Sequence, residues 1–290
     1  MGKSLKMAWR NMWRNWRRTV IAVAAIVLGL ILLIFMAGLI EGSDQAIFGN
    51  MVRLYGGNIQ IHAPGFGEKA NKMPMLPVEN DAVVLETVLA HPDVSAAARR
   101  ITTGGVVSTR EGTFPVQITG VDPEAEIDIS IVSENIKSGR YLITGETDAV
   151  LIGKSLAELL EVGVGDTVTL VGRRKNEEMR QRTMTIVGIY SLGLSEAEKG
   201  NVFITLSEAQ TLYNLRDQVT EISIILESVG QENAVITDLN ATLPGYEIDS
   251  WDTLQPEMRQ VMDMKANVTQ AFSLIVLLIA SVGVLNLMLM

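Results

Sequence analysis

Two long apolar runs without a charged residue lie near the ends of the chain, at residues 20–40 and 272–290. A helix rises about 1.5 Å per residue and the hydrocarbon core of a bilayer is about 30 Å thick, so either run is long enough to cross it as a helix. The pattern predicts transmembrane helices at residues 19–40 and 271–290. Residues 41–270 would then form a folded domain on one side of the membrane.

Between these runs, short stretches rich in β-branched residues alternate with stretches of helical pattern. The strand-like stretches are residues 58–62, 114–121, 149–152, 167–171, 183–190, 202–205 and 221–226. The helical stretches are residues 81–90, 155–160, 207–215 and 231–243. This alternation predicts an α+β domain. A further helix is expected to begin at Asp252 and to continue into the second span.

Residues 1–18 have the pattern of an amphipathic helix that lies on a membrane surface. On a helical wheel, Leu5, Met12 and three tryptophans fall on one side. The opposite side carries six cations, which are Lys3, Lys6, Arg10, Arg14, Arg17 and Arg18. The tryptophans would lie at the depth of the lipid headgroups, and the cations would face anionic lipid or an acidic protein surface. The same cations would also serve as a topology signal alone, without any partner.

These six cations set the expected orientation as well. They precede the first run without an acidic residue among them, whereas Glu41 and Asp44 follow it. Basic residues close to a span stay in the cytoplasm, so both ends of the chain are predicted to be cytoplasmic and the domain extracytoplasmic. A cleaved signal peptide is the alternative for residues 1–40, but its apolar region normally has only about 7 to 15 residues. The chain has a formal net charge of −9, and an acidic domain argues against nucleic acid as a partner.

Small residues recur inside and beside the predicted spans. Gly38 and Gly42 are four positions apart, and Gly283 is followed about one turn later by Asn286. Small residues let membrane helices approach closely, and a buried amide can form a hydrogen bond across the interface. We expect these positions at helix–helix contacts, either with unspecified neighbouring helices or in a dimer.

One short motif suggests a phosphate-binding loop. Gly153, Lys154 and Ser155 follow an apolar strand and precede a helix. Such a loop also needs a glycine five residues earlier, because its backbone amides wrap the phosphate. The residue at that position is Asp148, whose carboxylate would repel phosphate. We therefore predict a plain strand-to-helix turn and no nucleotide binding.

Other candidate chemistry is scarce. The chain has no cysteine and two histidines, His62 and His91, and neither has metal-ligand spacing around it. No nucleophile and base occur at a readable spacing. The sequence predicts a non-catalytic protein without a metal or another cofactor, in which both histidines have structural roles.

Several short motifs occur in order along nearly the whole chain. They begin with Trp9-Arg10-Asn11 and continue from Arg14 to Thr19 into the first apolar run. Further motifs lie at residues 57–61, 120–123, 150–154, 164–168, 186–190 and 283–288. In this order they resemble FtsX-like ABC transporter permeases, the superfamily that includes MacB efflux subunits and Lol lipoprotein-releasing subunits. The combination is most similar to the lipoprotein-releasing type.

The resemblance implies a non-catalytic, multi-pass permease subunit of the cytoplasmic (inner) membrane that pairs with a second permease subunit as a homo- or heterodimer. A separate or fused cytoplasmic ABC ATPase would hydrolyse ATP. The cations that would face this ATPase or the lipid bilayer are Lys6, Arg10, Arg14, Arg17 and Arg18. The extracytoplasmic domain, of the MacB-like periplasmic core type, would move mechanically. It would handle lipoprotein, peptide or drug cargo, or meet a periplasmic adaptor.

Members of this superfamily have four spans, whereas this chain stops at Met290, within or at the end of the second predicted span. We therefore expect it to be truncated there. A rival hypothesis is a two-span membrane sensor with an extracytoplasmic ligand-binding domain. A sensor would need a cytoplasmic signalling region after its second span, and its external domain is often a helical bundle. The strand-rich pattern of residues 41–270 counts against this rival.

Overall fold

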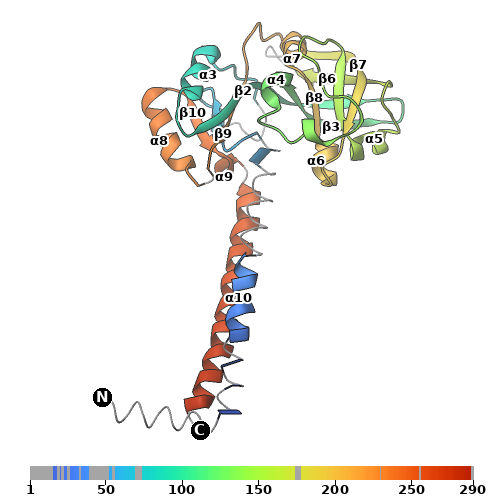
Figure 1. The fold of residues 1–290 in the computed structure, drawn as a ribbon. Helices are drawn as coiled ribbons and strands as arrows, with labels where there is room; N and C mark the ends of the chain where they lie inside the picture. The colour runs from blue at the N-terminus through green and yellow to red at the C-terminus, as the bar shows by residue number, and fades with distance from the viewer. Residues whose placement is uncertain are drawn as a thin grey trace. The chain divides into compact units, whose positions relative to one another are not determined.

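The computed structural model describes residues 16, 17, 20, 23, 24, 27–32, 34–38, 52, 53, 56–68, 74–173, 178–228, 230–254 and 256–288. The chain divides into two compact units. One unit is Asn50–Leu254, and the other combines Met1–Gly49 with Gln255–Met290. Figure 1 shows the described helices and strands of both units.

In the described part of Asn50–Leu254, ten strands form one sheet in the order β10-β1-β9-β2-β3-β8-β5-β7-β4, with β6 pairing with β2 and β7. The strands are β1 (Ile59–His62), β2 (Val94–Ser108), β3 (Thr113–Val121), β4 (Ile136–Gly139), β5 (Ala149–Gly153), β6 (Thr167–Arg173), β7 (Met179–Tyr190), β8 (Asn201–Thr205), β9 (Glu221–Leu226) and β10 (Glu247–Ser250).

Strand β2 belongs to two halves of this unit. Its first part pairs with β9, and its last four residues, from Gly105 to Ser108, pair with β6. Because β6 also pairs with β7, strands β2, β3, β8, β5, β7 and β6 form a closed circuit, which we call the barrel lobe. Strands β10, β1, β9 and the first part of β2 form the sheet lobe. Figure 1 shows α3 and α8 beside the sheet lobe and α5, α6 and α7 beside the barrel lobe.

Short helices and a 3-10 turn between residues 81 and 254 accompany the described strands of this unit. They are α3 (Asp81–Leu89), α4 (Pro123–Glu126), η2 (Ser133–Asn135), α5 (Lys154–Leu160), α6 (Ser195–Gly200), α7 (Leu206–Tyr213), α8 (Glu232–Thr242) and α9 (Trp251–Leu254). Local capping explains where several begin and end. The Thr205 side chain accepts a hydrogen bond from the amide of Glu208 and starts α7, and Asn214 ends it in the left-handed conformation. Aliphatic side chains from both lobes, including Ile59, Ile118 and Ile152, form one core.

The observed elements confirm the predicted α+β domain. Each predicted strand and each predicted helix between residues 58 and 243 is present, with ends that differ by a few residues. The sequence pattern did not predict β2, β4, β10, α4 or α6. In β2 the sequence VSAAARRITTGGVVS has small residues and adjacent arginines, and its burial changes where the strand passes from one lobe to the other. The sequence of β2 therefore lacks the regular alternation of apolar and polar positions by which a strand is predicted.

The second unit contains α10 (Pro256–Met288). The predicted domain border at residue 270 lies inside this helix, and the compact unit before it ends at Leu254. The predicted helix from Asp252 is present as α9 and α10, with Gln255 between them outside the described residues. Within the described part of the chain, no helix has the length and hydropathy needed to cross a membrane. The two predicted spans stay predictions.

Candidate functional site

A row of charged side chains crosses the sheet lobe. The strand register places His62 of β1 directly opposite Glu247 of β10 on one side and Glu221 of β9 on the other. Glu221 is in turn opposite Arg100 of β2. Directly opposed residues lie on the same face of a sheet, so these four side chains are neighbours across four strands. We call Glu247, His62, Glu221 and Arg100 the charge row.

The charge row is largely buried. The exposed fractions of His62, Glu221 and Arg100 are 1%, 5% and 4%. Neighbouring Ile59 and Ile61 of β1 belong to the aliphatic core, whereas the charge row lies on the other face of the same strands. Buried charges need partners, because their desolvation is otherwise uncompensated. The contacts of each charged side chain therefore decide whether its desolvation is offset.

At one end of the row, Arg100 is bound by a glutamate from outside the sheet. Its Nε donates to Oε2 of Glu126 in α4 at 2.9 Å, and its Nη2 donates to Oε1 of the same carboxylate. Its Nη1 lies 3.8 Å from Oε1 of Glu221. Although burial disfavours the charged guanidinium, the Glu126 and Glu221 carboxylates raise the pKa of Arg100, so it carries its charge at neutral pH. This bidentate pair ties α4 to β2.

His62, which lies inside the row between Glu247 and Glu221, has a more unusual environment. Neither of its ring nitrogens has a hydrogen-bond partner among the described residues, and Nε2 lies 3.8 Å from Oε2 of Glu221. The Phe66 ring stacks on the imidazole with centroids 3.6 Å apart and an interplanar angle of 5°. The carboxylate of Glu247 accepts hydrogen bonds from the amides of Gly65 at 2.5 Å and Gly67 at 2.7 Å. Residues 63–68 are thereby held against the sheet.

The charge balance of the row depends on the protonation of one ring. With a neutral imidazole, the row and Glu126 contain three carboxylates and one guanidinium. Burial by itself opposes ionisation of Glu221, yet His62 and Arg100 hold the pKa of this carboxyl below its ordinary value. Among the described residues, no group of three or more histidine or acidic side chains is arranged to hold a metal ion.

The candidate phosphate motif is a strand-to-helix turn, as predicted. Gly153 ends β5, and α5 begins at Lys154. A buried carboxylate from α6 occupies the start of α5, because Oε2 of Glu198 accepts hydrogen bonds from the Ser155 amide at 3.2 Å and the Ser155 hydroxyl at 2.7 Å. A Cβ on Gly153 would lie 2.1 Å from the Glu198 backbone oxygen. The chain therefore supplies its own anion at this helix terminus.

Glu198 and Asp148 accept further hydrogen bonds around this turn. Oε1 of Glu198 accepts hydrogen bonds from the amides of Leu192 and Gly193, at 2.7 Å and 2.9 Å, and from the Ser191 hydroxyl at 3.1 Å. Asp148 has a positive φ of 55°, and its carboxylate accepts a hydrogen bond of 2.8 Å from Nε of Arg182. The Asp148 carboxylate therefore pairs with Arg182, a cation of the same domain.

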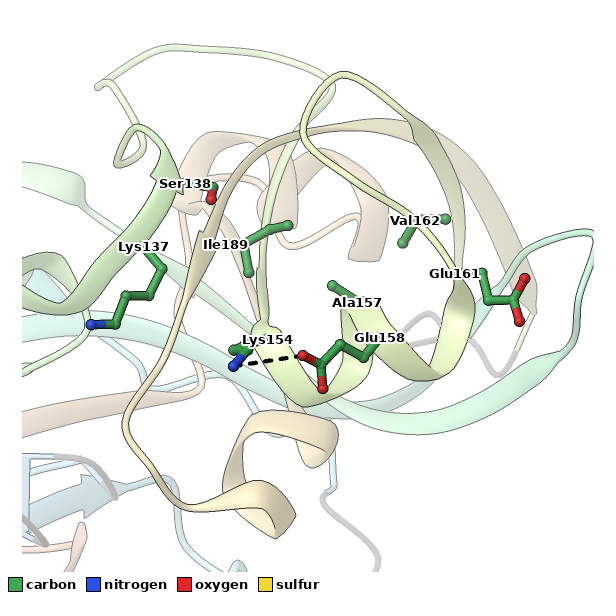
Figure 2. A pocket seen from close by; sticks show the side chains of 8 residues that line it. All are labelled: Lys137, Ser138, Lys154, Ala157, Glu158, Glu161, Val162 and Ile189. Carbon is green, nitrogen blue, oxygen red and sulfur yellow. Dashed lines mark ion pairs between the residues drawn. The ribbon is translucent and has the colours of Figure 1, made fainter.

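A hollow of about 440 Å³ lies beside α5 (Figure 2). Its wall is formed by Lys137, Ser138, Lys154, Ala157, Glu158, Glu161, Val162 and Ile189. Lys154 Nζ lies 3.6 Å from Oε1 of Glu158, which is the ion pair drawn in Figure 2. The described lining combines an aliphatic floor with exposed charges and offers no nucleophile beside a base. It lies at the end of the sheet, where β4 is the last strand in the described order.

Most of the site residues predicted from the sequence are not among the residues that the structure describes. Lys6, Arg10, Arg14, Arg18 and Gly42 are outside the described residues.

The other four are described only in part. Arg17 is helical, and its guanidinium carbon lies 5.9 Å from the centroid of the Trp16 ring. Gly38 ends a described helical segment, and Gly283 and Asn286 lie in α10. The predicted roles of these residues in membrane seating, ATPase contact and helix packing stay predictions.

The structure assigns the two histidines to different surroundings. His91 follows α3, and its Nδ1 accepts a hydrogen bond of 3.2 Å from the Asp93 amide. His62 is part of the charge row, which was not predicted from the sequence. The only sequence signal was a histidine in a strand, because Glu221 and Arg100 are distant in the chain.

Comparison with known proteins gives the family. The model of the MacB-like periplasmic core domain matches residues 19–242. A curated relative, the lipoprotein-releasing system transmembrane protein LolC of Neisseria meningitidis serogroup B (strain ATCC BAA-335 / MC58), is 24% identical over 220 residues, which are 72% of this chain and 49% of that protein. This chain therefore spans about half the length of that relative.

Solved structures of lower similarity also match. The periplasmic region of MacB from Actinobacillus actinomycetemcomitans matches with a TM-score of 0.48 and 14% identity, over 72% of this chain and 95% of that one. The extracellular domain of the noncanonic ABC-type transporter YknZ from Gram-positive bacteria matches with a TM-score of 0.45 and 14% identity, over 67% of this chain and 99% of that one.

The family match covers well over half of the chain, from residue 19 to residue 242. The chain belongs to the family of proteins with a MacB-like periplasmic core domain. The resemblance to FtsX-like and MacB-type ABC permeases is thereby confirmed.

Proposed function

We propose that this chain is part of a permease subunit of an ABC transporter of the FtsX-like mechanotransmission type. The subunit is a non-catalytic, multi-pass protein of the inner membrane, and its large domain is extracytoplasmic. It couples ATP hydrolysis by a cytoplasmic ABC ATPase to movement of that domain, which handles lipoprotein, peptide or drug cargo. The family match over residues 19–242 carries this proposal. The relative whose name describes a lipoprotein-releasing system favours lipoprotein among these cargoes.

The arrangement of β1 and β10 supports mechanical coupling. These first and last strands of the domain are antiparallel neighbours, with Ile59 opposite Ser250, and the Trp251 amide donates to the Asn58 oxygen at 3.0 Å. A displacement at either end of the domain therefore reaches the same pair of strands.

Asn58 extends this connection into the sheet lobe. Its Nδ2 donates to Oε1 of Glu232 in α8 at 3.1 Å, and its Oδ1 accepts a hydrogen bond of 3.0 Å from the Leu226 amide of β9. Both side-chain contacts are buried and join segments that are far apart in sequence. The start of β1 is thus attached to α8 and β9 as well as to β10.

A contact from the segment before β1 reaches toward the barrel lobe. Nη2 of Arg53 donates to Oε1 of Glu134 at 2.6 Å and to the Ser130 oxygen at 3.2 Å. Ser130 and Glu134 lie between α4 and β4, and Ile129, next to Ser130, is fully buried. Arg53 therefore connects the segment before β1 to the segment between α4 and β4, which supports mechanical coupling through this unit.

In the proposed assembly, a second permease subunit completes a homo- or heterodimer in the bilayer. The cations of residues 1–18 lie on the inner membrane surface or against the ATPase. Each cation near an anionic surface contributes about 1 kcal/mol, so reversal of three charges has a measurable effect.

The experiment uses the complete subunit, co-purified with its cytoplasmic ATPase and reconstituted in anionic bilayers. The variant Arg10→Glu, Arg14→Glu and Arg17→Glu should reduce ATP turnover or membrane seating. The matched control reverses three exposed cations of the domain, Arg110, Lys137 and Arg173, and should leave both unchanged. Equal ATP turnover and equal membrane seating in the two variants would contradict a role of residues 1–18 in membrane or ATPase contact. Absence of any associated ATPase, together with small-ligand binding by the domain, would instead support a two-span sensor.

A further inference from the structure

We propose that His62 is a proton-operated latch that holds β1 and residues 63–68 more firmly when the extracytoplasmic surroundings become acidic. Its regulatory effect on transport rests on the proposed function, whereas the latch itself does not. An imidazole is the side chain whose charge normally changes between pH 5 and 8. His62 occupies a position where that change alters the contacts of three strands.

The neutral ring is poorly satisfied where it lies. His62 is 1% exposed, and neither Nδ1 nor Nε2 has a hydrogen-bond partner among the described residues. A buried polar group without a partner is unfavourable. The carboxylate of Glu221 is 3.8 Å from Nε2 and is itself 5% exposed. A proton on the ring would turn this contact into a buried ion pair.

Charged groups face the ring from every neighbouring strand. Glu221 comes from β9, and Glu247 and Asp249 come from β10, with Asp249 opposite Gln60 in the adjacent register position. Arg100 of β2 is bound by Glu126 and lies beyond Glu221 in the row. Glu68, exposed at the end of residues 63–68, is the remaining titratable side chain of that segment. Carboxylates therefore outnumber cations among the groups around the ring, and a charged imidazolium would have an opposite charge beside it.

Protonation would also strengthen the contact with Phe66. The two rings are parallel and 3.6 Å apart, so a charged imidazolium would lie over the face of the phenyl ring. Phe66 lies between Gly65 and Gly67, whose amides are bound by Glu247. The loop is therefore attached to the sheet by one interaction that responds to the proton and by two hydrogen bonds to a carboxylate.

The position of His62 in the sheet allows its protonation to affect neighbouring elements of the domain. His62 ends β1, which pairs with β10 along its whole length, and β10 is the last strand before α9. Firmer attachment of β1 to β9 would stiffen β1, which forms with β10 the strand pair that receives displacements in the proposed mechanism. Acidification would then change the coupling between the domain and its flanking segments.

The test uses the full chain in lipid nanodiscs with ¹³Cε1-labelled histidine. The chain has two histidines, so His91 is an internal reference. Its Nε2 lies 3.7 Å from Oδ2 of Asp238, a residue whose side chain is mostly exposed. The His62 signal should change across the pH range in which an imidazole normally ionises, and Glu221→Gln should move that change to lower pH while the His91 signal stays as it is in the unmodified chain. A His62 signal that stays neutral throughout overturns the proposal.

Amide hydrogen exchange provides a second measurement. After correction for intrinsic rates, β1 and residues 63–68 should exchange roughly fivefold more slowly, or slower still, at pH 5.5 than at pH 8. His62→Gln should abolish the difference, and His91→Gln should keep it. If His62→Gln does not fold, Glu221→Gln serves instead and should reduce the difference. Equal protection at both pH values in the unmodified chain contradicts the latch.

Regulation is tested separately in the complete transporter. ATP turnover of the subunit with its ATPase should depend on extracytoplasmic pH, and His62→Gln should remove that dependence relative to His91→Gln. A titrating His62 with no effect on turnover would overturn the regulatory role and leave the latch intact. Failure of the subunit to associate with an ATPase would count against the proposed function, without altering the titration and exchange results.

Discussion

Nε2 of His62 lies 3.8 Å from Oε2 of Glu221, and the strand register places these two buried residues directly opposite each other. Glu221 also lies 3.8 Å from Arg100, which binds Glu126 of α4. Four elements of the domain thus depend on a continuous set of buried charges. Removal of one member leaves the other charges buried without their partner, which lowers the free energy of unfolding by a measurable amount.

Arg100→Met should strongly destabilise the domain. The substitution keeps much of the side-chain volume but leaves the buried carboxylates of Glu126 and Glu221 without their cation, which typically costs about 3–5 kcal/mol of the free energy of unfolding. The control is Arg140→Met, because Arg140 pairs with Glu146 at the surface. That change should cost no more than about 1 kcal/mol. Urea denaturation compares the variants, and equal losses would contradict the importance of the buried cluster.

Glu198→Gln should weaken the domain at neutral pH and much less in acid. Burial by itself would raise the pKa of Glu198, but hydrogen bonds from Ser155, Leu192 and Gly193 lower it below the ordinary value. A carboxyl with a lowered pKa stabilises the folded state above its unfolded pKa of about 4.3, and the stabilisation is lost as pH falls through the folded value.

The free energy of unfolding should therefore differ most between the unmodified domain and Glu198→Gln near pH 7. The difference should shrink progressively below about pH 4.3. Glu196→Gln is the matched control, because Glu196 lies on the same helix with a side chain that is 92% exposed and paired with Lys199. That substitution should have little effect at either pH. A difference for Glu198→Gln that is constant with pH would show that its ionisation is not responsible.

Residues 50–254 should fold as a soluble domain without metal or oxidant. They form one compact unit, and a domain of this size buries enough apolar surface to be stable alone. The chain has no cysteine, so no disulfide is required. Thermal melts with and without chelator should coincide. Calorimetric titration with Mg-ATP should show no binding, because Glu198 occupies the start of α5; micromolar affinity would overturn this interpretation.

The predicted topology can be tested by single-cysteine labelling, since the chain has no native cysteine. Glu111 lies in the exposed turn between β2 and β3, so Glu111→Cys should react with an impermeant reagent from the extracytoplasmic side of intact cells. Ser4→Cys should react only after the cytoplasm is opened. The reverse result for these two positions would refute the orientation inferred from the basic residues before the first apolar run.

The sequence by itself determined much of the local structure of this domain. Runs of β-branched residues between turn residues identified β5 and β9, and the pattern from residue 207 to 215 identified α7. These elements are readable because each buries a regular set of side chains, and caps such as Thr205 lie next to the helix that they start. The order of short motifs along the chain also indicated the family, which depends on sequence alone.

Only the tertiary structure decided the closed circuit of strands and the charge row. Strand β2 pairs with β9 along one part and with β6 along another, and no local pattern specifies a strand that changes partners. His62, Arg100 and Glu221 are each ordinary polar positions in the sequence. They become a buried set of charges because the register of β1, β9 and β2 aligns them, and register is set by long-range pairing and packing.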